Sequence, residues 1–326
     1  MMKKPVIGII GIGKMGGNLA KQALNKGYKI IAFDKLPQKG LQNKGVQYQK
    51  SLAAMVQKVY APRIIFLYVP AGEAVDTLLT QLAPALSRGD IIVDGGNSYW
   101  GDSIKRAEQL KEKNIYFVDC GTSGGVDGAR HGACFMAGGE AAAMAHVAPI
   151  LQDLAVENGF VHTGDSGSGH YVKLVHNGIE FGMLQAIGEG LNLLAHYRDK
   201  LDFAEILKTW NNGSVIRSWL IDLMAQAYEE KEGFTTVPSF VEDTGEVNWL
   251  VTDALRLEVP IPVIAQSVMQ LFASRDKEHI AEKAIAMMRN GFGGHSFGPN
   301  PSIQQERQTG KIENRESSYL YEKETV

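Results

Sequence analysis

The chain has 326 residues, a formal net charge of −3 and 44% hydrophobic residues. This length predicts two domains, each with enough apolar side chains to build its own core. The small negative charge and the lack of a long basic run argue against a nucleic-acid partner. No apolar run reaches 18 residues, which argues against a membrane-spanning protein.

Two features bear on the cellular compartment. The N-terminus, MMKKPVIGIIGIGKMGG, enters a glycine-rich turn too early for a secretory signal peptide. The two cysteines, Cys120 and Cys134, have neither metal-ligand spacing nor a disulfide framework around them. We therefore expect a cytoplasmic protein without a bound metal.

The first segment, PVIGIIGIGKMGGNLAKQALNKGYKIIAFDK, reads as a strand, a glycine turn, a helix and a second strand. Its glycines form the pattern G-x-G-x-x-G, which lets the backbone approach a pyrophosphate at the positive end of the helix. The alternative is a glycine turn with only a structural role. The predicted cofactor-binding loop comprises Gly11, Ile12, Gly13, Lys14, Met15 and Gly16.

Asp34 ends the second predicted strand, about 20 residues after the glycine loop. An acid at this position accepts hydrogen bonds from the adenosine ribose hydroxyls and would repel a 2′-phosphate. NAD is therefore favoured over NADP, and the neighbouring Lys35 weakens this preference without reversing it.

Further apolar runs at 63–70, 90–97, 115–121 and 133–139 have the continuous character of buried parallel strands. Several end in short loops, VPAG, DGGN and GTSGG, which a doubly wound sheet would gather at its carboxyl edge, where ligands bind. Any single loop could be an ordinary turn, but together they are expected to line one cleft.

From residue 169 onward the pattern changes to amphipathic helices, with stretches predicted over 170–200, 202–213, 218–230, 247–258, 261–276 and 279–290. The fold class is thus α/β, with an N-terminal doubly wound Rossmann domain followed by an all-α C-terminal domain. We place the Rossmann domain at 1–167, the helical substrate and dimerisation domain at 168–297, and a mobile polar tail at 298–326.

The stretch GHYVKLVHNGIEFG, residues 169–182, otherwise reads as a buried helix but carries several polar groups. At about 100° per residue, Lys173, Asn177 and Glu180 fall on one stripe, with His176 on its flank. Burying an ammonium and a carboxylate is costly unless they pair or meet a ligand. The stripe is either an internally satisfied network or a base and an acid flanking a small polar substrate, with the pKa of Lys173 lowered by desolvation.

Taken together, GIGKMGGNLA, VPAG, DGGNS, DCGTSGG, KLVHNGIE and RNGFGGH resemble the 6-phosphogluconate dehydrogenase family, in its shorter branch within the β-hydroxyacid dehydrogenases. The similarity extends to about residue 297. It implies oxidation of the 3-hydroxyl of 6-phosphogluconate by hydride transfer to NAD, then decarboxylation to ribulose 5-phosphate. It also implies a role in gluconate use and the pentose phosphate pathway.

The resemblance assigns roles residue by residue. It implies that Lys173 takes the 3-hydroxyl proton and later returns one to the carbonyl oxygen, and that Glu180 protonates carbon 1 of the enediol. The implied substrate ligands are Asn97, Ser123, Gly124, Gly125, His176, Asn177, Arg289 and His295. Asn97 and the backbone of Pro70, Ala71 and Gly72 are expected at the cofactor. Because the family's second subunit lends the arginine and the histidine, a homodimer or a dimer of dimers is implied.

Departures from the family pattern concern the phosphate ligands. Phe181 stands where the family has a tyrosine, and the loop DTGEVNW has Asn248 near the position of a basic residue. The arginine expected in a later helix falls at Leu271, or at Arg275 if the alignment shifts. Each lost charge-assisted donor would cost about 1.5–3 kcal/mol of phosphate binding.

Three readings follow. The first is an NAD-linked 6-phosphogluconate dehydrogenase whose phosphate is held mainly by Arg289 and His295. The second is a related dehydrogenase acting on another sugar acid or a short 3-hydroxy acid. The third is a dinucleotide-binding sensor or partner protein without turnover, against which the presence of both Lys173 and Glu180 argues.

Overall fold

One mixed sheet of eight strands organises the N-terminal half of the computed structural model, which describes residues 4–301 and 304 apart from 37–38, 43 and 198. The strand order is β3-β2-β1-β4-β5-β6-β7-β8. The strands are β1 (Val6–Ile10), β2 (Lys29–Phe33), β3 (Gln47–Tyr48), β4 (Ile64–Leu67), β5 (Ile91–Asp94), β6 (Tyr116–Ser123), β7 (Ala133–Gly138) and β8 (Ala155–Gly164). Of the polar tail expected at 298–326, only residues 298–301 and 304 lie within the described residues.

Helices alternate with these strands, and the described elements that follow β8 are all helices. In the first half they are α1 (Lys14–Asn25), α2 (Lys39–Gln42), α3 (Leu52–Lys58), α4 (Glu73–Leu82), the 3-10 helix η1 (Ala83–Ala85), α5 (Trp100–Lys111), α6 (Gly125–His131) and α7 (Ala141–Leu154). After them come α8 (Ser168–Ala195), α9 (Phe203–Asn211), α10 (Trp219–Glu230), α11 (Glu246–Arg256), α12 (Pro262–Arg275) and α13 (Ile280–Gly293). The predicted order of elements is confirmed, with a Rossmann-like domain followed by helices.

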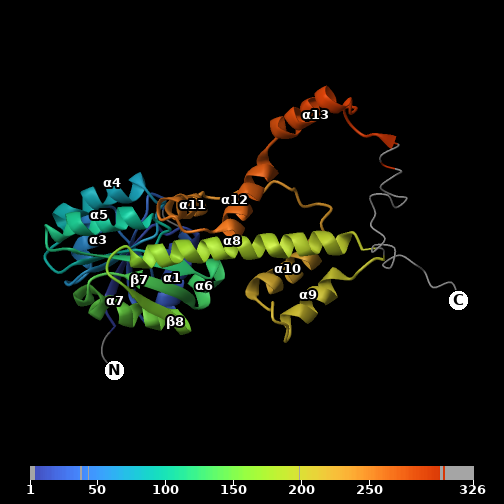
Figure 1. Cartoon of the computed structure of the whole chain (residues 1–326). Coiled ribbons are helices and arrows are strands. Elements are labelled where there is room, and N and C mark those ends of the chain that lie inside the picture. Colours follow the sequence, from blue (N-terminus) through green and yellow to red (C-terminus); the bar gives the residue numbers. More distant parts are fainter. Residues whose placement is uncertain (1–3, 37–38, 43, 198, 302–303, 305–326) are drawn as a thin grey trace. The chain divides into compact units, whose positions relative to one another are not determined.

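The sheet has a core on each face because successive side chains of a strand point to opposite sides. Alternate residues of the central strands join α1 and α7 in one apolar cluster, and the others join α3, α4 and α5 in a second. Figure 1 shows these two groups of helices on opposite faces of the sheet. The strands β1, β4 and β5 are buried from both sides, which explains their continuous apolar sequences.

Two details of the sheet differ from the sequence prediction. The strand at 133–139 was expected to be parallel, but β7 runs antiparallel to β6, with Ser123 opposite Cys134. The strand β8 was not predicted at all. It lies at the edge of the sheet and half of its residues are exposed, so it lacks the apolar run that identifies a buried strand.

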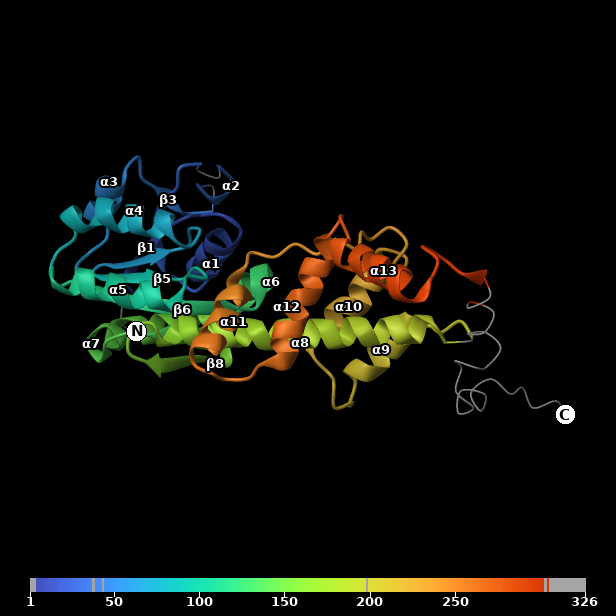
Figure 2. The ribbon, with the colours of Figure 1, turned by 45° about the horizontal axis from the view of Figure 1, so that its top comes forward.

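The chain divides into two compact units, and the long helix α8 contributes to both. The first unit comprises residues 1–180 and 244–264, and the second comprises 181–243 and 265–326. In the second unit, Leu191 of α8 packs with apolar residues of α9 and α10. Figures 1 and 2 show α9 and α10 beside the C-terminal part of α8. None of the helices in the described residues has the length and apolar character needed to cross a membrane.

Candidate active site

The turn between β1 and α1 has the geometry of a dinucleotide-binding loop. Gly11 adopts a φ of +87°, and a Cβ at Gly11 would overlap the carbonyl oxygen of Tyr68. A Cβ at Gly16 would overlap the carbonyl oxygen of Gly11, so this glycine allows the helix to approach the loop. Gly13 caps α1 without a side-chain hydrogen bond, and the space beside its Cα is open. The exposed start of α1 can therefore receive a pyrophosphate against its backbone.

Asp34 follows β2 and connects it to the glycine loop. Its Oδ2 accepts a hydrogen bond from the backbone N–H of Ile12 at 2.6 Å, and its Oδ1 accepts from the N–H of Leu36 at 2.8 Å. These bonds hold the carboxylate beside the loop that would bind the pyrophosphate. A carboxylate fixed there can accept further hydrogen bonds from a ribose.

The other predicted loops follow strands that end at the same edge of the sheet. Ile10 pairs with Leu67 of β4, and Leu67 pairs with Asp94 of β5. The segments 70–72, 95–98 and 123–125 follow β4, β5 and β6 in turn. Their position at the carboxyl edge agrees with the expected ligand site of a doubly wound sheet.

Helix α8 buries two residues of its polar stripe, Lys173 and Asn177, whereas the third, Glu180, is 39% exposed and part of the apolar surface of the helix is exposed as well. Lys173 and Asn177 are each only 7% exposed, but Ile179 is 53% exposed and Val172 38%. The expectation that the apolar residues of this segment would be the buried ones is wrong for these two positions. Lys173 packs against the sheet because Gly121 on β6, which has no side chain, makes room for it.

The environment of Lys173 lowers its basicity. Burial lowers the pKa of the Lys173 ammonium, and the carboxylates of Glu180 and Glu246 oppose this effect only in part. The Nζ atom lies 3.4 Å from Nδ1 of His176. A lysine that can lose its proton more easily than in water suits a general base.

His176 connects the helix to the loop after β6. Its Nε2 is 3.1 Å from the hydroxyl of Ser123, and its Nδ1 is 3.2 Å from Oδ1 of Asn177 and 3.9 Å from Oε2 of Glu180. Burial, and secondly the charge of Lys173, lower the pKa of His176. The imidazole is therefore neutral at physiological pH and can both donate and accept a hydrogen bond.

The buried carboxylate of Asp119 on β6 fixes the start of α8. It accepts hydrogen bonds from the backbone N–H groups of Gly167 at 2.6 Å and His170 at 2.7 Å. Burial raises the pKa of Asp119 despite these bonds. Because the unpaired N–H groups of a helix start prefer a negative partner, this contact holds the helix that carries Lys173 against the sheet.

The positions at which the family pattern is broken lie in both compact units. Asn248 is in the first unit, at the start of α11, and its buried Oδ1 has no hydrogen-bond partner among the described residues. Phe181 and Leu271 belong to the second unit. Arg275, the alternative to Leu271, pairs with Glu242 at 3.0 Å and Asp243 at 3.4 Å.

Arg289 and His295 also belong to the second unit. Arg289 is an exposed residue of α13, and none of the side chains of this helix is buried. His295 follows the helix, and its carbonyl oxygen accepts a hydrogen bond from Asn290 at 2.7 Å. Within one chain, neither side chain is held by a described residue in a polar contact.

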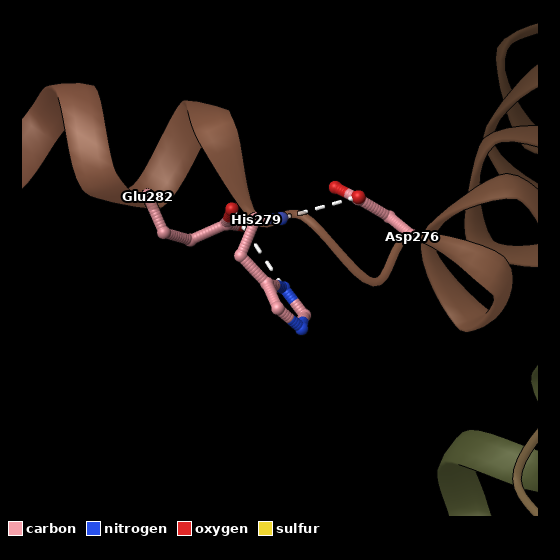
Figure 3. Close-up of side chains that lie close together, drawn as sticks. All are labelled: Asp276, His279 and Glu282. Atoms are coloured by element: carbon pink, nitrogen blue, oxygen red, sulfur yellow. Dashed lines mark hydrogen bonds and ion pairs between the residues drawn. The ribbon is translucent and has the colours of Figure 1, made fainter.

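Asp276, His279 and Glu282 form a group spaced closely enough to hold a metal ion. All three are exposed, and Figure 3 shows that their contacts belong to the turn between α12 and α13. Oδ1 of Asp276 accepts hydrogen bonds from the backbone N–H groups of Glu278 and His279. These bonds, which lower the pKa of Asp276, account for the cluster as a helix-start turn.

Some residues that shape the site were not identified from the sequence. Gly121 and Asp119 were read only as parts of a strand motif, and Tyr68 as part of an apolar run. The ring of Tyr68 fills the space beside Gly95, and the Cβ of Tyr68 lies 3.0 Å from the position that a Cβ at Gly16 would take. Such packing roles have no sequence signature, because they depend on which strands become neighbours.

Comparisons with known proteins match this architecture over nearly the whole chain. Residues 6–164 match the NAD binding domain of 6-phosphogluconate dehydrogenase, and residues 169–314 match the C-terminal domain of the same enzyme family. The chain is 41% identical over 292 residues to the putative 6-phosphogluconate dehydrogenase YqeC of Bacillus subtilis, covering 89% of this chain and 98% of that protein.

Two further relatives extend the comparison. The NAD(+)-dependent, decarboxylating 6-phosphogluconate dehydrogenase of Haloferax volcanii is 41% identical over 293 residues, covering 89% of this chain and 97% of that protein. The solved structure of Plasmodium falciparum 6-phosphogluconate dehydrogenase superimposes with a TM-score of 0.77 at 29% identity, covering 91% of this chain and 66% of that one. The chain therefore belongs to the 6-phosphogluconate dehydrogenase family, within the β-hydroxyacid dehydrogenases.

Proposed function

We propose that this protein is an NAD-linked, decarboxylating 6-phosphogluconate dehydrogenase. The observation that carries the proposal is the desolvated Lys173 on α8, packed against β6 of a dinucleotide-binding sheet and followed by Glu180 on the same face. The Haloferax relative is named as an NAD(+)-dependent, decarboxylating 6-phosphogluconate dehydrogenase, and the Bacillus relative as a putative 6-phosphogluconate dehydrogenase. The two free cysteines agree with the reducing conditions of the cytoplasm, where we place the protein.

The glycine loop fits a dinucleotide. The overlap that a Cβ would cause at Gly11 and Gly16, together with the open space at Gly13, favours a backbone that approaches a pyrophosphate closely. We assign the cofactor to this loop, to Asp34, to the backbone of 70–72 and to Asn97. The bound dinucleotide would supply the hydride acceptor, and the residues of the chain would supply orientation and proton transfer.

NAD is the proposed form of the cofactor. The Asp34 carboxylate beside the loop would accept hydrogen bonds from ribose hydroxyls and repel a 2′-phosphate. The Haloferax relative is named as NAD(+)-dependent, whereas the Plasmodium structure contains NADP+. The acidic residue of this chain supports the first of these two preferences.

Lys173 would act as the general base in the first step. Its neutral amine takes the proton of the substrate 3-hydroxyl while the hydride leaves carbon 3, which produces a 3-keto acid and an ammonium. The ammonium then returns a proton to the carbonyl oxygen as the bond to the carboxylate breaks and carbon dioxide leaves. The lowered pKa of Lys173 suits it to both directions of transfer.

Glu180 would complete the reaction by donating a proton to carbon 1 of the enediol, while the hydroxyl on carbon 2 gives its proton to the neutral amine of Lys173 and becomes the ketone of the product. Its side chain is 39% exposed in the single chain, so it can exchange protons with solvent. Ser123, His176 and Asn177 would hold the hydroxyl and carboxylate groups of the substrate. A neutral His176 suits this role because it can hydrogen-bond to an alcohol without the charge that would repel Lys173.

We further propose that the active form is a homodimer or a dimer of dimers. Helix α13 buries none of its side chains within the chain, including its large apolar ones. Met288 is 60% exposed and Phe292 78%. Large apolar side chains exposed one helical turn apart are typical of a subunit interface. Arg289 and His295, which have no polar side-chain contact with another described residue, would then reach the substrate phosphate of the neighbouring subunit.

A second candidate function rests on the incomplete phosphate site. Phe181, Asn248 and Leu271 offer no positive charge, and Arg275 is engaged by two carboxylates. A related activity on another sugar acid or a short 3-hydroxy acid would need fewer cationic donors. A sensor or partner protein without turnover is the third possibility, and it does not account for the desolvated Lys173.

Steady-state kinetics would separate these functions. 6-Phosphogluconate, gluconate and short 3-hydroxy acids would be compared with NAD and with NADP, and carbon dioxide release would be measured in parallel. We expect the highest kcat/KM for 6-phosphogluconate with NAD, and one carbon dioxide for each NADH formed. A higher kcat/KM for an unphosphorylated acid would favour the second function, and dinucleotide binding without turnover of any of them would favour the third.

A further inference from the structure

Arg106 on α5 is a buried cation outside the set of residues assigned so far. The residue is 2% exposed, and its guanidinium faces the loops that follow β4 and β5. Its Nε donates a hydrogen bond to Oδ1 of Asp76 at 2.7 Å, and its Nη2 donates to the carbonyl oxygen of Gly72 at 3.1 Å. Its Nη1 lies 3.8 Å from Oδ2 of Asp94. One side chain therefore contacts three groups from two separate segments.

The first contact holds the loop after β4. Gly72 has a φ of +82° and precedes α4, so its carbonyl oxygen belongs to the turn between strand and helix. Asp76 lies in the first turn of α4. By binding both, Arg106 fixes the conformation of the segment 70–72, whose backbone we assign to the cofactor.

The second contact holds the loop after β5. The side chain of Asp94 is fully buried, its Oδ1 accepts from the N–H of Gly96 at 3.1 Å and its Oδ2 accepts from the hydroxyl of Ser98 at 2.7 Å. These bonds fold the turn that presents Asn97. Burying a carboxylate is costly unless a positive charge lies nearby, and Arg106 provides that charge for Asp94.

The guanidinium of Arg106 lies between the segment 70–72 and the turn 95–98 and contacts groups that hold each of them. A guanidinium presents several N–H groups in one plane, so it can bind a carbonyl and two carboxylates simultaneously, which an ammonium cannot do with the same geometry. Nη1 of Arg106 has no hydrogen bond to a described residue, so its ion pair with Asp94 is its link to the β5 turn.

We propose that Arg106 is a positioning residue for dinucleotide binding. It holds the segment 70–72 and the turn 95–98 in fixed positions relative to each other. The proposal rests on the proposed function, since it assumes that these loops bind the cofactor. Arg106 would not touch the cofactor or the substrate. Its loss would let the two loops move independently. The dinucleotide would then have to order both loops when it binds, and the free-energy cost of this ordering would reduce its affinity.

The same two strands provide a matched control at their opposite ends. Arg63 directly precedes β4 and Asp90 directly precedes β5, and Nη1 of Arg63 lies 2.8 Å from the fully buried carboxylate of Asp90. Arg63 also donates from Nε to the carbonyl oxygen of Val56 at 3.0 Å. The chemistry resembles that of Arg106, but the pair is at the amino edge of the sheet, away from the ligand loops.

The test compares Arg106→Gln with Arg63→Gln in the full-length protein. Dissociation constants for NAD+ would be measured by isothermal titration calorimetry without substrate, and thermal unfolding would be followed for each variant. Both changes should lower the Tm. Only Arg106→Gln should raise the Kd, by about tenfold or more, as expected for the loss of one charge-assisted hydrogen bond.

An equal change in Kd for both variants, or an unchanged Kd in Arg106→Gln, would overturn the inference. If Arg106→Gln does not fold, the Kd of Asp76→Ala for NAD+ tests the inference instead. Asp76 is 57% exposed, and its replacement leaves the buried pair of Arg106 and Asp94 intact. A raised Kd in Asp76→Ala supports the inference, and an unchanged Kd overturns it. A wild-type protein that binds neither NAD+ nor NADP+ would overturn the proposed function itself, which is a distinct result.

Discussion

The Cα of Gly121 on β6 lies directly against the side chain of Lys173 on α8, so that a methyl group at Gly121 would overlap the Cβ and Cγ of Lys173. This contact sets the depth at which the lysine is buried. Because Asp119, two residues earlier on the same strand, binds the backbone at the start of α8, the strand determines both the position and the burial of the candidate base.

Replacing Gly121 with alanine should therefore displace α8 from the sheet. We expect a loss of about 1–3 kcal/mol in the free energy of unfolding, as for other overpacked cores, and a clear fall in kcat/KM. Urea unfolding and steady-state kinetics would measure the two effects. Gly40→Ala in α2 is the control, since no atom of the described residues lies within 4 Å of its Cβ position and the change should be neutral or slightly stabilising. Equal stability of the two variants would contradict the packing argument.

The lowered pKa of Lys173 predicts a particular dependence of stability on pH. Between this pKa and about 10.4, the usual value for lysine, the unfolded chain binds more protons at this position than the folded protein does. The free energy of unfolding should therefore gain a contribution that increases with pH across that window. Lys173→Met should remove this contribution and should be more stable than the wild type at neutral pH.

Urea unfolding of both proteins over a series of pH values would test this prediction. The quantity of interest is the difference between wild type and Lys173→Met, because the other titrating groups are common to both. This difference should shrink as pH rises. A difference that is constant with pH would mean that Lys173 keeps an ordinary pKa in the folded protein.

The order of the main elements could be predicted from the sequence because strong local patterns specify them. The glycine loop, the apolar runs of β4 and β5 and the helical periodicity around Lys173 each depend on nearby residues. The edge strand β8 and the antiparallel direction of β7 could not be predicted in this way. Half of the residues of β8 are exposed, and the direction of a strand depends on its connections rather than on its composition.

For the candidate site, motifs identified the residues that would contact ligands but not those that position them. Lys173 and Asp34 stand out because their charges interrupt apolar patterns. Arg106 lies on an ordinary amphipathic helix, and only the fold shows that it reaches Gly72 and Asp94. The sequence also gave no indication that Val172 would be exposed, since that exposure depends on what covers the helix.

Cofactor preference can be tested at Asp34. Replacing it with serine or asparagine should remove the repulsion of a 2′-phosphate and shift the ratio of kcat/KM values from NAD towards NADP. The carboxylate also accepts from the N–H of Ile12, so the serine variant should lose some affinity for both cofactors. Kinetics with each cofactor would measure the ratio. A wild-type preference for NADP would contradict the assignment of Asp34.

The subunit arrangement can be tested by complementation. If Arg289 reaches into the site of a neighbouring subunit, Arg289→Ala and Lys173→Met should each be nearly inactive as homodimers. A heterodimer of the two should regain activity, because one of its sites would combine an intact lysine with an intact arginine. Truncation after Ala286 should likewise abolish activity while most NAD affinity is retained. Verified heterodimers without activity would mean that Arg289 serves its own subunit or none.

The proposed division of labour between Lys173 and Glu180 predicts that their variants fail at different steps. Lys173→Met should abolish hydride transfer, since no group would take the hydroxyl proton, and the loss should approach the upper end of the 10²–10⁴-fold range for general bases. Glu180→Gln keeps its size but cannot donate a carboxyl proton, so its first turnover should still produce NADH before the block at the enediol. Rapid mixing with detection of NADH would separate the two. Equal loss of first-turnover NADH in both variants would leave the polar stripe of α8 as a binding network only.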